Sequence, residues 1–569
     1  MQKRWTLKPA DEATVIALQA ALKIHPALCR LLVARGIETY EAAKNFFRPE
    51  LKDLHDPFLM KDMHKAIERI TNALVNQEKI LIYGDYDVDG TTAIATVYSF
   101  FKEIHPFIDF YVPHRYTEGY GISKQSIDFA KANGFTLVIA LDCGIKANEK
   151  IAYANTLGID FVICDHHQPG EEIPAAVAVL DPKRIDCPYP YKELSGCGIG
   201  FKLIQAFSQQ HGIDAEKYMQ WLDLLCVSIG SDIVSMTGEN RILAYHGLKK
   251  LNTNPCCGLR RLKELAGSEK EMDIDDVVFL IGPRINAAGR MDDARHAVRL
   301  LISEDEDFDG DEKAYQLNKY NNERKDLDRS ITAHALEMIA SDQTLVARKS
   351  TVVFHPEWHK GVIGIVASRL TETYYRPTIV LTESDGKVTG SARSVKHFDL
   401  YEAIYECRDL LIQFGGHKFA AGLTMQKENI DAFRLKFDEV VSARISDHQL
   451  VPEIEIDAQL ELSDITPRFF GILQQMAPFG PDNMKPVFLT RGVLDSGWSK
   501  IVKEDHIKFS VRGNAGGPTV GGIGFGLAPK FNLLKSGPFD LVYQLAENEW
   551  QGNVSLQLVV KDLLPAENN

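Results

Sequence analysis

The stretch KILIYGDYDVDG, at residues 79–90, joins an apolar strand to a dense acidic turn. Residues 79–84 form a short apolar run of the kind typical of a buried strand. Asp85, Asp87 and Asp89 follow at once, and three carboxylates so close together repel one another unless a cation lies among them. Oxygen-rich clusters of this kind suit hard cations. The stretch therefore predicts a strand that ends in a metal-binding turn.

Two other structures could account for this acidic turn. An EF-hand loop would need Glu at its twelfth position, where Thr96 stands, and a helix rather than a strand ahead of it. The EF-hand is therefore excluded. A solvated acidic turn is the other alternative, since short motifs also occur without function.

The chain around this turn alternates between strands and helices. The apolar runs at 108–112, 136–141, 160–164 and 176–180 are expected to be strands, and the stretch at 91–101 a helix. Such alternation predicts an α/β fold with a mostly parallel sheet and helices on both of its faces.

Acidic and imidazole side chains follow two more of these strands. Asp142 ends the strand TLVIAL, while Asp165, His166 and His167 follow the strand DFVIC. A lone Asp at a strand end is usually a turn residue or a helix cap. Ligand sites of open α/β sheets, however, form at the carboxyl edge of the strands. The coincidence therefore predicts one shared site.

A further candidate is Asp232, near the end of an apolar helix expected at 221–234. A helix cap is its alternative role. The combined set is rich in oxygen and lacks thiolate, which favours Mn²⁺ or Mg²⁺ over structural Zn²⁺. Two ions about 3.5–4 Å apart activate water and stabilise the leaving oxygen in phosphoryl transfer. The residues thus predict a two-metal phosphoester or phosphoanhydride hydrolase.

The rest of the chain divides into further units. A charged stretch at 311–341 lacks Gly and Pro and predicts a long connector helix, about 45 Å if unbroken. Partial period-two alternation after about residue 450 predicts a small barrel of the OB type. The expected units are a helical N-terminal cap at 1–50, an α/β domain at 51–250, a helical region with the connector at 251–345, a second α/β lobe at 346–448 and the OB-like barrel at 449–569.

Composition limits the class of protein. The chain has 569 residues, 45% hydrophobic and 25% charged, and a net charge of −14, as in an ordinary globular protein. The negative net charge argues against a protein that coats nucleic acid non-specifically. Any binding of nucleic acid must therefore come from a focused site. The sequence has no apolar run long enough to predict a membrane helix, and its start lacks the unbroken apolar core of a signal peptide. A cytoplasmic protein with reduced thiols is therefore expected. The sequence contains no CxxC pair, so a structural zinc site is not expected.

Several motifs occur in the order found in one family. DHH at 165–167, together with DYDVDG, ALDCGI and SDIV, resembles the DHH phosphoesterase superfamily, and nearly the whole chain resembles its RecJ exonuclease branch. The resemblance implies a DHH lobe and a DHHA1 lobe joined by the long helix, with an OB-like barrel after them. The other matching segments are PHRYTEGYG (113–121), LSGCGIGFKL (194–203), GPRINAAGRMDDA (282–294), WHKGVIGIVASRL (358–370), GSARS (390–394), FGGHKFAAG (414–422) and PFGPDNMKPVF (478–488).

The resemblance also implies an activity. It is single-stranded-DNA-specific 5′→3′ exonuclease activity that releases 5′-mononucleotides by two-metal hydrolysis, in DNA repair and recombination. Two Mn²⁺ or Mg²⁺ ions would be the cofactors. The expected partners are single-stranded DNA, single-strand-binding protein and a helicase, for a monomer without membrane contact.

Roles for individual residues follow from the same resemblance. Asp165 would orient His166, and His167 would contact the scissile phosphate and protonate the leaving oxygen. A surface or interdomain salt bridge is the alternative for each arginine. The implied metal ligands are Asp85, Asp87, Asp89, Asp142, His166 and Asp232, with Asp85 a ligand or a close neighbour of one. The residues implied to hold the strand are Arg115, Asn286, Arg290, Ser391, Arg393, Gly415, Gly416 and His417.

Two other functions stay open. A small-substrate DHH phosphodiesterase, acting on nanoRNA or cyclic dinucleotides, would not explain the region at 450–569. A non-catalytic scaffold would have lost ligands, whereas all the expected ones are present. The segment WHKGVIG is also ambiguous, because Trp358 and His359 precede a helix either as part of an anion site or as interlobe packing.

Overall fold

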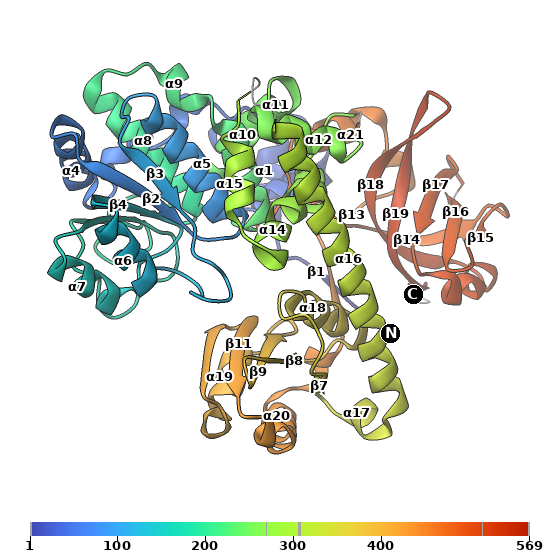
Figure 1. Ribbon diagram of the computed structural model, residues 1–569. Helices are drawn as coiled ribbons and strands as arrows, with labels where there is room; N and C mark the ends of the chain where they lie inside the picture. The colour runs from blue at the N-terminus through green and yellow to red at the C-terminus, as the bar shows by residue number, and fades with distance from the viewer. Residues whose placement is uncertain (1–2, 269, 305–308, 515, 567–569) are drawn as a thin grey trace.

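The computed structural model describes residues 3–268, 270–304, 309–514 and 516–566. It confirms the predicted fold class, with two α/β lobes, a long helix that joins them and a C-terminal β-barrel (Figure 1). Within these ranges, no helix combines the length and the apolar character that crossing a membrane requires.

The first lobe is built on a parallel sheet of order β3-β2-β4-β5-β6. Ile80 and Ile82 pack under helices on one face, whereas Leu81 and Tyr83 pack on the other. Since all strands run the same way, their carboxyl ends share one edge. The strands are β2 (Lys79–Gly84), β3 (Ile108–Tyr111), β4 (Phe135–Leu141), β5 (Asp160–Cys164) and β6 (Ala178–Leu180), and the covering helices are α4 (Met63–Val75), α5 (Val88–Lys102), α6 (Lys124–Ala132), α7 (Asn148–Thr156) and α8 (Gly196–His211).

The connector is helix α16 (Gly310–Ser341), whose 32 residues span about 48 Å. Leu317 packs against the first lobe, and Ile331 and Ile339 pack against the second. One unbroken helix therefore belongs to both hydrophobic cores. The helices near its start are α10 (Leu222–Ser231), α11 (Gly238–Thr253), α12 (Cys257–Leu265), α14 (Gly282–Met291) and α15 (Arg295–Leu301).

The second lobe contains a mixed sheet of order β10-β11-β9-β8-β7, in which β7 and β8 are parallel and the other pairs antiparallel. Trp358 is buried beneath α18, so packing and not an exposed anion site accounts for it. The elements are β7 (Thr351–Phe354), α18 (Ile363–Tyr374), β8 (Thr378–Ser384), β9 (Lys387–Arg393), α19 (Leu400–Tyr405), β10 (Gln413–His417), β11 (Ala420–Met425) and α20 (Ile430–Arg444).

The C-terminal sheet closes on itself. Strand β14 pairs with both β16 and β18, which completes the ring β14-β16-β17-β19-β18. A closed five-stranded barrel with one parallel pair, here β17 and β19, is the expected OB fold. The strands are β14 (Phe488–Asp495), β16 (His506–Gly513), β17 (Val520–Gly524), β18 (Phe539–Trp550) and β19 (Asn553–Pro565).

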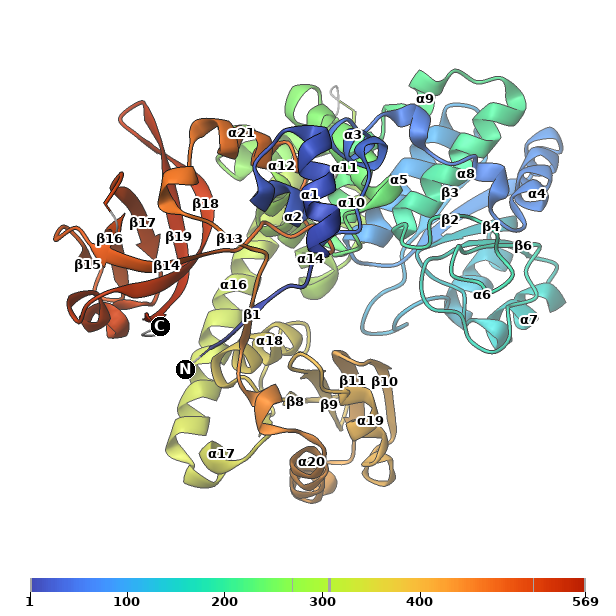
Figure 2. The ribbon, with the colours of Figure 1, turned by 180° about the vertical axis from the view of Figure 1, so that it is seen from behind.

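The N-terminal segment contains the expected helices and one strand that the sequence did not predict. Strand β1 (Arg4–Leu7) pairs in parallel with β12 (Glu453–Ile456), in the chain that leads to the barrel (Figure 2). A four-residue strand is too short to give a periodic signal, and its partner is remote in sequence. The helices α1 (Glu12–Leu22), α2 (Pro26–Val33) and α3 (Tyr40–Phe47) follow. They share a core with the barrel, whereas the exact domain limits stay a prediction.

Candidate metal centre

The carboxyl edge of the first sheet gathers the predicted metal ligands. The turn after β2 supplies three aspartates, the end of β4 supplies Asp142, the end of β5 supplies His166, and the end of α10 supplies Asp232. His167, predicted to act on the substrate, lies beside them. Within each of three groups, the candidate ligand atoms lie within 4.8 Å of one another. The groups are Asp85, Asp87 and Asp142; Asp89, His166 and Asp232; and Asp142, His166 and His167.

Local backbone geometry directs these carboxylates. Asp87 is the N-cap of α5, and its carboxylate accepts a hydrogen bond from the Gly90 N–H at 3.1 Å. Asp142 adopts a left-handed conformation with φ of 58°, which aspartate tolerates better than most residues. The chain therefore turns sharply after β4 and directs this carboxylate along the edge of the sheet.

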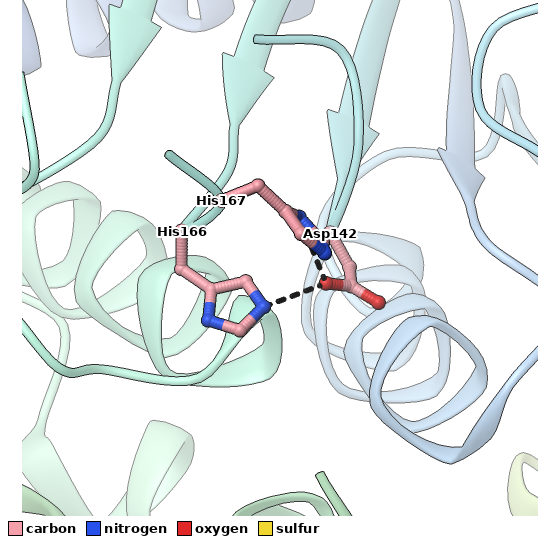
Figure 3. A group of neighbouring side chains, drawn as sticks. All are labelled: Asp142, His166 and His167. Atoms are coloured by element: carbon pink, nitrogen blue, oxygen red, sulfur yellow. Dashed lines mark ion pairs between the residues drawn. The ribbon is translucent and has the colours of Figure 1, made fainter. Parts of the chain in front are cut away.

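His166 lies at the centre of the cluster. Its Nε2 atom lies 3.1 Å from Asp142 Oδ1, an interaction drawn in Figure 3, and 3.6 Å from carboxylate oxygens of both Asp89 and Asp232. Burial, the largest cause, lowers the pKa of His166. The ring is thus neutral at pH 7 and keeps a lone pair for a metal ion.

Three hydrogen-bond donors from α8 and α10 fix the orientation of the Asp89 carboxylate. The backbone N–H groups of Gly196 and Cys197, at the start of α8, donate to it at 2.6 and 2.8 Å. The Ser228 hydroxyl of α10 donates at 2.7 Å and also contacts the Ser195 hydroxyl. A helix N-terminus favours a carboxylate in this position. Three fixed donors therefore orient one oxygen of Asp89 toward His166.

Replacing Ser228 by Ala is expected to weaken Mn²⁺ binding by roughly 10–100-fold, the usual effect of losing a group that orients a metal ligand. Calorimetric titration of Mn²⁺ measures this change without relying on activity. Ser208→Ala is the matched control, because the Ser208 hydroxyl is buried on α8 and has no hydrogen-bond partner in the described part of the chain. Equal Mn²⁺ affinities for S228A and the wild type would contradict the orienting role.

Asp165 contacts a different ring from the expected one. The sequence interpretation paired it with His166, but its Oδ1 atom lies 2.7 Å from Nδ1 of His167. The other Asp165 oxygen accepts the N–H of Ile145 at 2.8 Å. The two neighbouring imidazole rings point in different directions after β5, so only the His167 ring reaches this carboxylate, whereas His166 donates to it through its backbone N–H at 2.8 Å. Burial opposes a charge on His167, but the hydrogen bond and charge of Asp165 outweigh it and raise the pKa of His167 to about 9.

Several buried polar atoms of the cluster lack hydrogen-bond partners among the described residues, as expected of atoms that bind a hard cation. Oδ1 of Asp85, Oδ1 of Asp142 and both ring nitrogens of His166 are buried and form no hydrogen bond with the described residues. Burial and then neighbouring carboxylates raise the pKa values of Asp85, Asp142 and Asp232. Because buried charges of one sign destabilise a fold unless a counter-ion compensates them, the residues fit divalent cations bound through oxygen and imidazole.

An arginine cluster lies beside the centre and involves both lobes. Burial and then the charge of Arg115 lower the pKa values of Arg290 and Arg393, that of Arg290 to about 10. Arg290 donates to the Gly361 carbonyl of the second lobe at 3.0 Å, and Arg393 donates to the Ser391 hydroxyl at 3.1 Å. Three mutually repelling guanidinium groups are suited to anionic phosphates.

The other predicted strand-binding residues lie in two places. The Asn286 side chain accepts the Val88 N–H at 3.2 Å, so it braces the acidic turn. Gly415, Gly416 and His417 lie on β10 at the edge of the second lobe, and Gly416 has a φ of 143° that favours glycine. His417 lines a cavity together with His167 of the first lobe. The structure thus brings His417 toward the metal centre and gives Asn286 a contact within the first lobe.

The sequence also matches known families. The DHH family N-terminal domain matches residues 79–229, the DHHA1 domain matches 344–443, and the RecJ OB domain matches 456–562. The single-stranded-DNA-specific exonuclease RecJ of Bacillus subtilis is 36% identical over 568 residues, which cover 99% of this chain and 71% of that protein. The chain belongs to the RecJ family. RecJ of Escherichia coli is 30% identical over 570 residues, 95% of this chain and 96% of that protein.

Solved RecJ structures share this architecture. RecJ from Thermus thermophilus in complex with Mn²⁺ has a TM-score of 0.85 at 27% identity, covering 99% of this chain and 80% of that chain. A second RecJ structure, bound to manganese, has a TM-score of 0.61 at 30% identity, covering 70% of this chain and 98% of that chain. The lobes, connector and barrel described above are therefore the RecJ fold.

Three features of this RecJ site escaped the sequence analysis. The stretch GCGIG lacks a preceding strand, so no anion-binding role was predicted, yet its N–H groups hold Asp89. Ser195, the N-cap of α8, is the signal that could have located this helix start. Ser228 carries no sequence signal of its own. Asp181 follows β6 at the same edge, and burial raises its pKa to about 7.

Proposed function

We propose that this RecJ chain is a single-stranded-DNA-specific 5′→3′ exonuclease that releases 5′-mononucleotides. The observation that carries the proposal is a cluster of six candidate ligands, with buried atoms that lack partners, next to an arginine cluster shared by two lobes. A DNA strand presents phosphates to both clusters at once. The similarity to RecJ exonucleases over nearly the whole chain supports the same substrate.

The five predicted carboxylates and the His166 imidazole would hold two Mn²⁺ or Mg²⁺ ions. When bound, such ions activate a water molecule and neutralise the phosphate. The water oxygen forms a bond to phosphorus as the bond from phosphorus to the 3′ oxygen breaks. The water loses a proton, and the 3′ oxygen gains one. Arg115, Arg290 and Arg393 would hold the neighbouring phosphates by paired hydrogen bonds.

His167 would supply the proton to the leaving 3′ oxygen. Its raised pKa keeps it protonated at pH 7, and Asp165 fixes the ring through Nδ1. His167→Ala is therefore expected to lower kcat by roughly 10²–10⁴-fold, the usual range for an acid catalyst. The rate of mononucleotide release at pH 7 measures it, and His448→Ala is the control because it replaces an exposed histidine remote from the centre.

A substrate with sulfur in place of the 3′ bridging oxygen sharpens this prediction. A thiolate leaves without a proton, so H167A should be far less impaired on this substrate than on ordinary DNA. An equal loss on both substrates would mean that His167 serves the phosphate and not the leaving group. Full activity of H167A on ordinary DNA would contradict the role altogether.

We attribute the restriction of the substrate to single-stranded DNA to a chain of hydrogen bonds, here called the tie, that connects the two lobes. The Tyr116 hydroxyl donates to the Arg290 carbonyl, and the Arg290 side chain donates to Gly361 across the gap between lobes. These contacts limit the width available beside the metal centre. A single strand can follow the arginines, whereas a duplex would have to break the tie.

Digestion of end-labelled DNA tests the function. Single strands labelled at the 5′ or the 3′ end, and a duplex, are incubated in Mn²⁺ and in EDTA. Immediate release of the 5′ label as mononucleotide, a shrinking ladder from the 3′ label and an intact duplex are expected in Mn²⁺ only. The Asp89→Ala/His166→Ala variant controls for contaminating nucleases. Intact long strands would contradict the proposal, and cleavage confined to dinucleotides would favour a small-substrate phosphodiesterase.

The cellular setting belongs to the same proposal. A 5′→3′ exonuclease of this kind would act in DNA repair and recombination in the cytoplasm, as a monomer. Single-strand-binding protein and a helicase would supply its single-stranded substrate. The barrel, expected at residues 449–569, would guide the strand. The two lobes, expected at 51–250 and 346–448, would cleave and hold it. Sedimentation of the free chain and of its mixture with single-strand-binding protein tests the monomer and the partner.

A further inference from the structure

The loop at residues 112–123, between β3 and α6, contacts both the acidic turn and the tie. The Arg115 guanidinium carbon lies 4.7 Å from the centre of the Tyr86 ring in that turn. The next side chain, Tyr116, donates its hydroxyl to the Arg290 carbonyl and so begins the tie between the lobes. Two neighbouring residues thus extend from one loop to two parts of the proposed site.

The same loop also contacts the residue proposed as the acid catalyst. The Tyr120 hydroxyl lies 3.2 Å from Nε2 of His167 and 3.3 Å from the Asp142 carbonyl oxygen. Gly119 and Gly121 flank this tyrosine with φ of 84° and 78°, values that favour glycine. The chain can therefore turn sharply on both sides of Tyr120 and direct its ring toward His167.

One carboxylate holds this loop and gathers both of its ends. Oε1 of Glu118 accepts the His114 N–H at 2.8 Å, and Oε2 accepts the Ser123 hydroxyl at 2.6 Å. The Tyr111 hydroxyl, at the end of β3, lies 3.1 and 3.0 Å from the two oxygens. Since Ser123 is also the N-cap of α6, Glu118 connects the end of the strand, the loop and the start of the helix.

Hydrogen bonds, and not an ion pair, are what Glu118 contributes. Its side chain is half-buried, and its donors are two hydroxyls and one backbone N–H. Hydrogen bonds to a charged acceptor are stronger than those between neutral groups. The arrangement therefore fixes the loop by its geometry, without help from a cation.

We infer that Glu118 is a positioning residue for the exonuclease and acts through the three loop side chains described above. The inference rests on the proposed function and adds to it a residue that orders the site from within the loop. Without the carboxylate, the donors at both ends of the loop lose their shared partner. Arg115, Tyr116 and Tyr120 then lose their positions together, so that strand binding and proton transfer both weaken.

Three substitutions of Glu118 separate its hydrogen bonds from its charge. Glu118→Asp keeps the charge but is one methylene shorter, so its carboxylate cannot reach the donors at both ends of the loop. Glu118→Gln removes the charge but keeps an oxygen for the backbone N–H, and the hydroxyls can rotate to accept from its amide. E118D and E118A are therefore expected to raise KM for single-stranded DNA and to lower kcat by roughly 10–100-fold, the scale of a small misplacement. E118Q should retain most of the activity.

Amide hydrogen exchange of residues 113–122 measures the order of the loop without relying on activity. Exchange should be faster in E118D and E118A than in the wild type and nearly unchanged in E118Q. Asp438→Ala is the matched control, because Asp438 of α20 accepts the Ser350 N–H and hydroxyl at 3.1 and 2.7 Å in the second lobe. D438A should leave KM and kcat close to the wild-type values. If E118A does not fold, E118D and E118Q carry the comparison.

Impaired E118D beside active E118Q, with hydrogen exchange in the same order, supports the inference. Full activity of E118D would overturn it, as would equal losses in E118Q and E118A, which would assign the effect to charge. A loss in D438A as large as that in E118A would also overturn it, because any destabilised variant would then behave alike. Failure of the wild type to digest any strand would instead refute the proposed function, and hydrogen exchange would still show whether Glu118 orders the loop.

Discussion

Replacing Asp142 by Asn is expected to abolish strand digestion and, without metal, to make the protein harder to unfold. Oδ1 of Asp142 is buried without a hydrogen-bond partner among the described residues. Burial, followed by the charges of Asp89 and Asp87, raises its pKa. The folded chain therefore loses stability as pH rises from the usual aspartate pKa through the raised one, and an amide removes that loss. We expect a gain of about 1–3 kcal/mol in EDTA, the scale of one uncompensated buried group.

The same substitution removes a carboxylate shared by two ligand groups, so turnover should fall by roughly a thousandfold or more. Thermal unfolding in EDTA and in Mn²⁺ separates the two effects, because metal stabilises only the form that binds it. Asp128→Asn is the matched control, since this exposed carboxylate accepts a hydrogen bond from Tyr153 far from the site. A D142N protein that melts lower than the wild type in EDTA would contradict the argument.

Replacing Lys202 by Met is expected to lower the free energy of unfolding by about 3–5 kcal/mol, the cost of leaving a buried charge unpaired. The Lys202 side chain is fully buried, and its Nζ atom lies 2.7 Å from Glu239 Oε1 and 3.0 Å from the His55 carbonyl. Glu239 also accepts hydrogen bonds from the His55 N–H and the Tyr189 hydroxyl. Without the ammonium group, this carboxylate would have no counter-charge in the core.

Urea unfolding at pH 7 measures the change for K202M. Lys202→Met/Glu239→Gln should recover most of the loss, because the second substitution removes the orphaned charge. Lys183→Met is the control, since Lys183 pairs with the half-exposed Glu193 at 3.4 Å and such pairs contribute little. Equal destabilisation by the single and the double variant would show that packing, and not the ion pair, makes position 202 important.

The sequence was sufficient for the sheet and for most of the centre. Apolar runs before Asp85, Asp142 and Asp165 identified β2, β4 and β5, and parallel strands bring their ends together wherever the helices lie. The OB barrel followed from alternation and turn residues. The connector α16 followed from a long stretch without Gly or Pro.

Contacts between remote segments could not be predicted in this way. Ser228 lies 139 residues from Asp89, and nothing in their spacing indicates that α10 brings a hydroxyl to that carboxylate. The choice of Asp165 between two adjacent histidines depends on how the chain turns after β5. The short strand β1 is defined only by its partner. Each of these features depends on how helices and strands pack together, and the periodicity of apolar residues in the sequence does not indicate that packing.

The pairing of β1 with β12 has a consequence for how the polypeptide matures on the ribosome. Arg4 lies opposite Glu453, so the first strand has no partner until about 450 further residues have been synthesised. At 5–20 residues per second, that wait is roughly 20–90 seconds. During it, the apolar faces of α1 and α2 lack the barrel residues that later cover them, such as Phe469 and Phe488. The nascent chain must therefore keep helices α1 and α2 from aggregating, and a barrel synthesised much later completes the fold of this segment.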